Sequence, residues 1–331
     1  MKGFFTLMTA STLSIATSLS VSAAQYYDCA TNTGCLAVGS VNSNATYAKT
    51  KHPIVLAHGM AAFNSIASIS SWYGIPEDLT KNGATVYSTK VSSFESSEVR
   101  GEQLLRQVQV IAAITPTRKV NLIGHSHGGQ SVRYVLGAAP QHVASVTAIA
   151  SPHKGTPVAD LARGAADADR SRLLAPVAST VVNGLGSMIA LLSGGGQYSQ
   201  NSLAGLDSLT TKGSAAFNAR FPVGLPSTAC GVGVAQHNGI RLYSWSGGKQ
   251  LTNPLDASDA ALAATNLAFL GETNDGLVGS CSSRFGTVIR DNYRMNHLDE
   301  VNHLFGLVSL LETNPVAVFR QHANRLKTAS L

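Results

Sequence analysis

A five-residue motif, Gly124-His125-Ser126-His127-Gly128, constrains the fold of this chain more than any other feature. It lies directly after the apolar run at residues 120–123 and directly before a segment with helical spacing. A serine at such a junction occupies a tight turn, in which the flanking glycines let strand and helix approach each other. The hydroxyl then projects above the C-terminal edge of the sheet, at the N-terminus of a helix. The context therefore predicts a nucleophilic serine at position 126.

Short apolar runs recur along the chain, with helical segments between them. Runs without polar alternation are typical of parallel strands that helices bury on both faces. Segment 97–114, for example, places Leu104, Val108 and Ile111 on one helical face between two such runs. The pattern predicts the α/β class, with a mostly parallel sheet and helices on both of its faces. Strands are expected at residues 53–57, 85–87, 120–123, 146–149, 240–245 and 287–291, and helices at 97–114, 129–137 and 315–327.

The chain is long enough to bury a large core, with 331 residues of which 44% are hydrophobic and 13% charged. This composition excludes a disordered or fibrous protein. The 24 Lys and Arg residues exceed the 18 Asp and Glu residues, but they are scattered and not interleaved with aromatic residues. Binding to nucleic acid is therefore not expected. Because no linker divides the chain, we expect a single domain over residues 25–331, with a large insertion at about residues 156–227.

Residues 1–24 are typical of a secretory signal peptide. One lysine precedes a short stretch of small and apolar residues that ends in Ser22-Ala23-Ala24. The stretch is too short and too rich in serine and threonine to span a membrane comfortably, and no later segment is apolar for long enough. We therefore expect cleavage after Ala23 or Ala24, and a soluble, exported mature protein.

The four cysteines of the chain are expected to form disulfides, because an exported protein normally oxidises them. Their spacing lacks the C-x-x-C pattern of redox and zinc sites, and four cysteines allow three pairings. Of these we expect Cys29 with Cys35 and Cys230 with Cys281. The second bond would close a long loop and stabilise the fold by about 4 kcal/mol.

A serine hydroxyl attacks a carbonyl efficiently only when a histidine removes its proton and a carboxylate orients that histidine. On this fold both partners follow the serine along the chain, the carboxylate first. Asp275 lies in an Asn-Asp-Gly turn after an apolar stretch, where a strand end can present an acid. His297 follows the next predicted strand and is favoured over His303, which lies deeper in its own segment. His322 falls in the predicted C-terminal helix, where a surface histidine is expected.

The attack creates an oxyanion, and each preorganised hydrogen-bond donor near it would stabilise the transition state by roughly 3–4 kcal/mol. Two backbone N–H groups are available. One belongs to His127, directly after the serine, and the other to Met60 in the His58-Gly59-Met60 loop that leaves the first predicted strand. We therefore expect Met60 and His127 to form an oxyanion hole.

Together these motifs resemble the Pseudomonas-type true lipases of bacterial lipase family I. The resemblance extends over nearly the whole chain after the signal peptide and is carried by residues 53–60, 124–129, 151–155, 274–281 and 295–302. It implies an α/β-hydrolase fold and the hydrolysis of triacylglycerols. It also implies a catalytic triad formed by Ser126, Asp275 and His297. Met60 and His127 would be the two oxyanion donors, and Cys230 and Cys281 would form a disulfide.

The resemblance further implies one bound calcium ion, Ca²⁺, as a structural cofactor. Its ligands would be the carboxylates of Asp256 and Asp299 and the backbone carbonyls of His303 and Leu307. Calcium requires hard oxygen ligands of this kind, but Asp256 can also be explained as the cap of a helix that starts at the next residue. Because Asp299 lies two residues after His297, a cation there would hold the catalytic loop. Relatives in the family have glutamine at the position of His303, a harmless change if only the carbonyl coordinates.

The predicted insertion contains an apolar stripe at helical spacing, formed by Leu174, Val177, Val181, Leu185, Met188 and Leu192. From the spacing alone, core packing is the favoured explanation. In the family that the chain resembles, this region is a mobile lid that covers the acyl site and opens at a lipid surface. An open lid would expose an apolar patch suited to that surface. We therefore hypothesise a lid at residues 171–194.

Three functions are weighed against one another. The first is a secreted triacylglycerol lipase, and the second is a carboxylesterase for short, soluble esters. The third is an α/β-hydrolase scaffold that only binds, against which the intact Ser, Asp and His in the right order argue. The resemblance also implies a membrane-anchored folding chaperone in the periplasm and export across the outer membrane, and a monomer is the default expectation.

Overall fold

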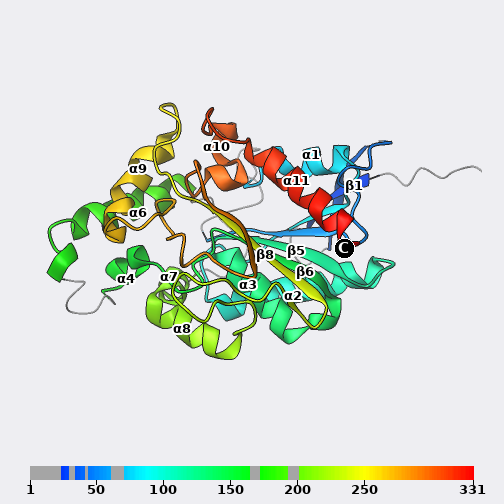
Figure 1. Ribbon diagram of the computed structural model, residues 1–331, viewed down its shortest axis with the longest axis horizontal. Helices are drawn as coiled ribbons and strands as arrows, with labels where there is room; N and C mark the ends of the chain where they lie inside the picture. The colour runs from blue at the N-terminus through cyan, green and yellow to red at the C-terminus, as the bar shows by residue number, and fades with distance from the viewer. Residues whose placement is uncertain (1–23, 30–33, 42–43, 61–70, 165–171, 193–200) are drawn as a thin grey trace, which may run out of the picture.

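A mostly parallel β-sheet lies between two layers of helices in the computed structural model, which describes residues 24–29, 34–41, 44–60, 71–164, 172–192 and 201–331 (Figure 1). The described strands follow the order β2-β1-β4-β3-β5-β6-β8-β7, and β9 pairs with β8. They are β1 Ala24–Cys29, β2 Leu36–Val41, β3 Ile54–Ala57, β4 Val86–Thr89, β5 Val120–His125, β6 Val143–Ile149, β7 Gln236–His237, β8 Ile240–Gly247 and β9 Thr287–Tyr293.

The six predicted strands are all present, as β3, β4, β5, β6, β8 and β9, and each pairs in parallel with its neighbours among them. The sequence reasoning missed β1 and β2, which form an antiparallel hairpin at one edge of the sheet. β1 joins the sheet through a parallel pairing with β4. The disulfide between Cys29 and Cys35 links the end of β1 to the residue before β2.

Alternate residues of the central strands face opposite layers. On β3, Ile54 and Leu56 belong to one core cluster and Val55 and Ala57 to the other. All four side chains are buried. Because both faces of the strand are covered, the sequence shows an uninterrupted apolar run instead of alternation.

The helices divide between the two faces of the sheet. α2 and α3 contribute to the cluster that contains Val55 and Ala57, and α1 and α11 contribute to the cluster that contains Ile54 and Leu56. The described α-helices are α1 Ile75–Lys81, α2 Ser97–Ile114, α3 His127–Ala138, α4 Pro157–Ala162, α6 Ala178–Leu192, α7 Ser202–Leu209, α8 Thr211–Arg220, α9 Ala257–Thr265, α10 His303–Gly306 and α11 Pro315–Thr328. Short 3₁₀ turns are η2 Pro140–His142, η3 Asn266–Phe269 and η4 Asp299–Val301. The three predicted helices correspond to α2, α3 and α11.

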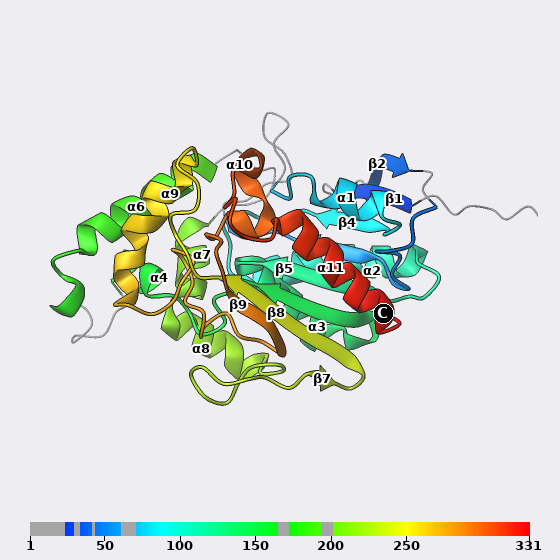
Figure 2. The ribbon, with the colours of Figure 1, turned by 45° about the horizontal axis from the view of Figure 1, so that its top comes forward.

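A third group of helices, α4 and α6 to α9, packs together at one end of the sheet (Figures 1 and 2). Four of these, α4 and α6 to α8, come from the predicted insertion. α6 lies along α9 so closely that a Cβ at Gly184 would stand 2.9 Å from the carbonyl oxygen of Ala261. None of the helices within the described ranges has the length and hydropathy needed to cross a membrane.

Candidate active site

Ser126 occupies the turn between β5 and α3, as the motif predicts. Its backbone has φ 54° and ψ −127°, a conformation that residues other than glycine rarely adopt. The turn is held by a hydrogen bond from the Ser126 N–H to the carbonyl oxygen of Ile149, 2.8 Å away. A Cβ at Gly124 would collide with the carbonyl of Gly128, and a Cβ at Gly128 with that of Ala57. Both glycines are therefore needed for strand and helix to meet at the serine.

The loop that follows β3 lies directly against Ser126. A Cβ at Gly59 would be only 2.8 Å from the Cβ of Ser126. The buried guanidinium of Arg100, on α2, donates hydrogen bonds to the carbonyl oxygens of His58 at 2.6 Å and Gly59 at 3.1 Å. Burial lowers the pKa of Arg100 to about 9, so the group remains a cation at neutral pH. This clamp fixes the backbone that leads into Met60.

His297 and Asp275 form a buried pair. The Nδ1 atom of His297 is 2.8 Å from Oδ2 of Asp275, and the other carboxylate oxygen accepts the N–H groups of Leu277 at 2.8 Å and Val278 at 2.7 Å. The His297 N–H also donates to the Asp275 carbonyl at 3.0 Å. Asp275 lies in a turn, as the Asn-Asp-Gly sequence predicts, and an isolated bridge between Asn274 and Gly279 closes this turn. These contacts hold the Asp275 carboxylate in place, and the carboxylate in turn orients the His297 ring through Nδ1.

Ser126 and His297 line the same cavity, of about 820 Å³ including the part that opens to solvent. Met60, His58 and Gly59 also line it, so the loop after β3 borders the space above the serine. Most of the remaining lining is apolar. Helices α4, α6 and α7 contribute Val158, Leu185, Ile189, Leu206 and Leu209, and the turn that contains Asp275 contributes Leu277. The cavity therefore has a polar end, with serine and histidine, and an apolar end that can accept a hydrocarbon chain.

Glu300, which the sequence did not indicate as a site residue, is buried close to His125 and His297. Its Oε1 accepts the N–H of Gly247, and its Oε2 lies 3.7 Å from Nε2 of His125. Burial and the charge of Asp275 raise the pKa of Glu300 well above its usual value, which favours the neutral acid. With His125 and His297, Glu300 forms a group whose potential metal-binding atoms lie within 4.8 Å of one another. Two of these are nitrogen atoms, so the group does not match the oxygen ligands that calcium prefers.

The two carboxylates expected to bind calcium, those of Asp256 and Asp299, lie in one buried cluster. The Nδ2 atom of Asn296 is 3.4 Å from Oδ2 of Asp256 and 2.8 Å from Oδ1 of Asp259, and its backbone N–H donates to Asp299 at 3.2 Å. Burial, followed by the charges of Asp256 and Asp259, raises the pKa of Asp299 to about 7. Burial also raises the pKa of Asp256. A cluster of buried carboxylates with elevated pKa values fits a hard cation, which would favour their ionised forms.

Asp256 also caps α9, because its Oδ1 accepts the N–H of Ser258 at 2.7 Å. The two explanations of this residue are compatible, since its second carboxylate oxygen is not used by the cap. The other expected ligands, the carbonyls of His303 and Leu307, flank a short segment with unusual backbone. Leu304 and Phe305 have φ values of 50° and 60°. Such a left-handed turn orients successive carbonyls differently from a helix, as a coordinating loop requires.

The structure contains both expected disulfides, Cys29–Cys35 and Cys230–Cys281. The interpretation of His322 as a surface residue is wrong. It is fully buried on α11, and its Nε2 lies 2.8 Å from the hydroxyl of Thr147. Burial lowers its pKa to about 3. Because Tyr243 and Trp245 pack against the ring, His322 belongs to the core between α11 and the sheet.

Solved structures of other proteins share this architecture. The mature lipase of Bacillus licheniformis superposes with a TM-score of 0.57 at 18% identity, over 85% of this chain and 93% of its own. A carboxyl esterase of metagenomic origin gives a TM-score of 0.57 at 17% identity, over 85% of this chain and 76% of its own. At such identities the likeness concerns the fold alone. The family model for the alpha/beta hydrolase fold matches residues 52–301, which confirms the predicted fold class.

Sequence relatives narrow the class. The triacylglycerol lipase of Vibrio cholerae is 52% identical over 289 residues, which make up 87% of this chain and 92% of that protein. Those of Burkholderia plantarii and Pseudomonas fragi are each 40% identical over 85% of this chain, and cover 87% and 98% of their own lengths. The chain therefore belongs to the alpha/beta hydrolase fold family and, within it, to the group of bacterial triacylglycerol lipases.

Proposed function

We propose that this protein is a triacylglycerol lipase that cleaves carboxylic esters through an acyl-enzyme on Ser126. The observation that carries the proposal is the 2.8 Å contact between His297 Nδ1 and Asp275 Oδ2, with His297 and Ser126 on the wall of one cavity. Membership of a family whose close members are named triacylglycerol lipases gives the substrate class.

In the first half of the reaction, Nε2 of His297 takes the proton from the Ser126 hydroxyl as Oγ attacks the ester carbonyl. Asp275 holds the imidazole in the tautomer with its proton on Nδ1 and stabilises the cation that forms. His297 then passes the proton to the oxygen of the leaving alcohol, and the bond to that oxygen breaks. In the second half, water attacks the acyl-enzyme with the same histidine as base, and the fatty acid leaves.

The oxyanion formed in each half would be bound by the backbone N–H groups of Met60 and His127. His127 starts α3, where the helix dipole adds to the effect of its N–H. The position of Met60 depends on the preceding carbonyls that Arg100 holds. The imidazole of His127 is itself buried and 2.9 Å from the Ser97 hydroxyl, which anchors the residue from its other side.

The apolar end of the cavity favours a long acyl chain over a short one. Leu185 and Ile189 on α6, Leu206 on α7 and Leu277 contribute to it, and burying a methylene there is worth about 0.8 kcal/mol. Each added methylene in a substrate chain would therefore improve binding until the cavity is filled. A carboxylesterase for short, soluble esters would gain little from such a lining.

One structural calcium ion, held by Asp256, Asp299 and the carbonyls of His303 and Leu307, completes the proposed site. When bound, the cation supplies positive charge that keeps the two buried carboxylates ionised. One proposed ligand, Asp299, lies two residues after His297, so the site would fix the loop that carries this histidine. The ion has no part in the chemical steps.

Residues 171–194 are proposed as a lid, and the described part of this segment supports a closed form. Val181 and Leu185 on α6 are buried in a cluster with Val158, Ala268 and Phe269, as the core-packing explanation requires. The lid hypothesis needs this packing to be reversible. The side chain of Met188 and residues 171, 193 and 194 lie outside the described parts.

The proposal includes secretion by way of the periplasm, after removal of a signal peptide at residues 1–24, of which all but the last lie outside the described residues. A membrane-anchored folding chaperone and a monomeric mature protein are also proposed, on the strength of the family resemblance.

The decisive assay is fatty-acid release from emulsified long-chain triacylglycerol, compared with hydrolysis of a short, soluble ester. The lipase proposal predicts activity on the emulsion that Ser126→Ala abolishes. Hydrolysis of the short ester alone would favour the carboxylesterase, and no turnover of either would favour a binding scaffold.

A further inference from the structure

Four leucines near the proposed calcium loop are largely exposed. The exposed fraction is 92% for Leu310, 77% for Leu311, 75% for Leu255 and 60% for Leu251. They come from two segments, residues 249–256 before α9 and residues 305–311 after His303. The side-chain amide of Asn253 donates to the carbonyl of Val308 at 3.1 Å and ties the segments together. α10 and the start of α9 are neighbours in both views (Figures 1 and 2).

This apolar surface continues toward the rim of the cavity. Phe305, with 59% of its surface exposed, packs edge-on against Tyr73, with a centroid distance of 6.2 Å. Tyr73 directly follows Trp72, and Phe305 lies two residues after His303. Trp72 and His303 both line the cavity. We call the set Leu251, Leu255, Phe305, Leu310 and Leu311 the leucine rim.

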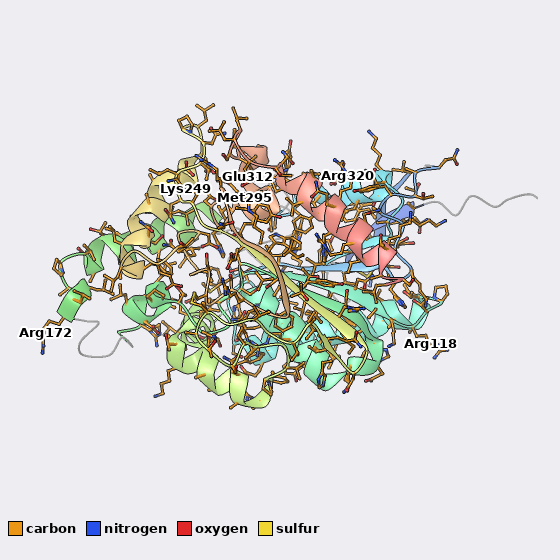
Figure 3. The ribbon with its side chains drawn as sticks, viewed as in Figure 1. Arg118, Arg172, Lys249, Met295, Glu312 and Arg320 are labelled. Atoms are coloured by element: carbon orange, nitrogen blue, oxygen red, sulfur yellow. A yellow bond between two sulfur atoms is a disulfide. The ribbon has the colours of Figure 1, made fainter. Side chains whose placement is uncertain are left out.

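Positive charge accompanies the leucine rim. Lys249 and Arg294 are both exposed. The Lys249 N–H donates to the carbonyl oxygen of Met295 at 3.3 Å, and Figure 3 shows Lys249 and Met295 close together. Met295 directly follows Arg294 in the chain. The carboxylates of Asp256, which ends the first segment, and Glu312, which follows the second, are shielded. Asp256 is buried, and Glu312 is paired with Arg290 at 2.8 Å. The two segments therefore expose leucines and the cation of Lys249 to a partner, but no carboxylate.

We propose that the leucine rim, flanked by Lys249 and Arg294, is an anchor for an anionic lipid surface. Apolar side chains on protruding loops enter the boundary between headgroups and acyl chains, and neighbouring cations bind anionic headgroups or released fatty acids. The proposal rests on the proposed lipase function, because the anchor would keep the rim of the cavity in contact with the lipid that contains the substrate.

A lipid surface fits this patch better than a second copy of the chain does. In a twofold dimer the same patch would face itself, so that Lys249 and Arg294 would approach their own symmetry mates. Like charges placed together at an interface oppose association. A fluid lipid surface requires no matching shape and supplies the opposite charge.

The anchor is separate from the proposed lid, because none of its residues lies on α6. Initial attachment therefore does not depend on lid opening. The leucine rim would bring the cavity to the surface first, and the lid would open there.

Vesicle binding tests the proposal apart from hydrolysis. Full-length mature protein carrying Ser126→Ala is sedimented with phosphatidylcholine vesicles, with and without phosphatidylglycerol, at fixed calcium concentration. Leu310→Ser/Leu311→Ser is expected to weaken binding about tenfold, and Lys249→Glu/Arg294→Glu to remove the preference for phosphatidylglycerol. The matched control is Leu36→Ser/Val38→Ser, which replaces two exposed apolar residues on the edge strand β2 and should bind like the parent.

Three results would overturn the proposal: unchanged binding by the Leu310/Leu311 variant, an equal loss in the β2 control, or a parent dimer that the Leu310/Leu311 substitution dissociates. Hydrolysis of a soluble ester, measured for the same variants with Ser126 restored, should stay at the parent level and shows that the fold is intact. If the parent hydrolyses no ester, the proposed function fails while the vesicle result still decides the anchor.

Discussion

The guanidinium of Arg100 lies 2.6 Å from the carbonyl oxygen of His58, two residues before the backbone N–H proposed as an oxyanion donor. A buried arginine without a carboxylate partner at this contact is costly, because burial alone lowers its pKa to about 9. The guanidinium holds the backbone of His58 and Gly59, which follows β3, beside Ser126.

Replacing Arg100 by lysine should lower kcat while changing KM little. Lysine keeps the charge but cannot hold both carbonyls with one planar group, so the Met60 N–H loses its alignment. We expect a fall in kcat of about tenfold to hundredfold on a soluble ester. Arg118→Lys, at an exposed position far from the site, serves as control (Figure 3). An unchanged kcat in Arg100→Lys, with an intact thermal transition, would remove the clamp from the mechanism.

Asp275 and Glu300 should differ sharply in their effects on activity. Asp275→Asn replaces an acceptor of the His297 Nδ1 proton with an amide and should reduce kcat about 10³- to 10⁴-fold. Glu300→Gln mimics the neutral acid that the raised pKa favours, and it should retain most activity. Steady-state kinetics on one soluble ester compares them. Equal losses in the two variants would mean that Glu300 works as a charged partner of the site.

Calcium should stabilise the protein more at high pH than at low pH. Without the cation, the folded-state pKa of Asp299 is about 7, above the unfolded value of about 3.9. The stability associated with its protonated form is present at low pH and is lost as the pH rises through 7. Calcium binds the ionised carboxylate, so the gain in Tm on adding calcium should be larger at pH 8 than at pH 5.

Asp299→Asn provides the control for calcium, since it removes both the ionisable group and the ligand. Its Tm should respond little to calcium at either pH. A wild-type gain in Tm that is equal at pH 5 and pH 8, or absent at both, would contradict the proposed ligands.

A charge on the buried face of α6 should separate the lid hypothesis from simple packing. Val181→Asp places a carboxylate in the cluster with Val158 and Phe269, whereas Val182→Asp changes an exposed neighbour. If α6 presents its buried face to lipid when the lid opens, Val181→Asp lowers emulsion activity but spares a soluble ester. The combination with a charge at Met188 should deepen the effect. Intact emulsion activity in these variants would refute a lid at residues 171–194.

The two disulfides should differ in their contribution to stability. The Cys230–Cys281 bond joins positions 51 residues apart, and the Cys29–Cys35 bond joins positions six residues apart. On the loop-entropy model the first stabilises the fold by about 4 kcal/mol and the second by about 2 kcal/mol. Denaturant unfolding of the paired serine variants measures both. A larger loss for Cys29→Ser/Cys35→Ser would show that the β1–β2 hairpin is needed for the whole sheet.

Features that depend on neighbouring residues could be predicted from the sequence, whereas buried contacts between distant segments could not. The apolar run before Ser126 and the glycines around it predict the turn, because each of these residues is required by its own backbone surroundings. β1 was missed because Gln25, Tyr26, Tyr27 and Asp28 form no apolar run, and pairing with β4 defines the strand. The burial of His322 follows from the contact between α11 and the sheet, which spacing along the helix does not reveal.

The carboxylates of the candidate site show the same difference between local features and contacts between distant segments. Asp275 is visible as a turn residue, but the proximity of Glu300 to His125 arises only when β5, β8 and the segment after β9 meet. Asp259 and Asn296 join the cluster around Asp256 and Asp299 through hydrogen bonds between segments 37 to 40 residues apart. The only local sign of this carboxylate cluster in the sequence is the spacing of three residues between Asp256 and Asp259.

The most direct test is covalent labelling with a p-nitrophenyl phosphonate ester, in which the serine oxygen displaces p-nitrophenolate and forms a bond to phosphorus. Mass spectrometry should find one phosphonyl group per chain, on the peptide that contains Ser126, together with loss of ester hydrolysis. Ser126→Ala should take up no label. Inhibition with the label on another residue, or hydrolysis that survives in Ser126→Ala, would contradict Ser126 as the nucleophile.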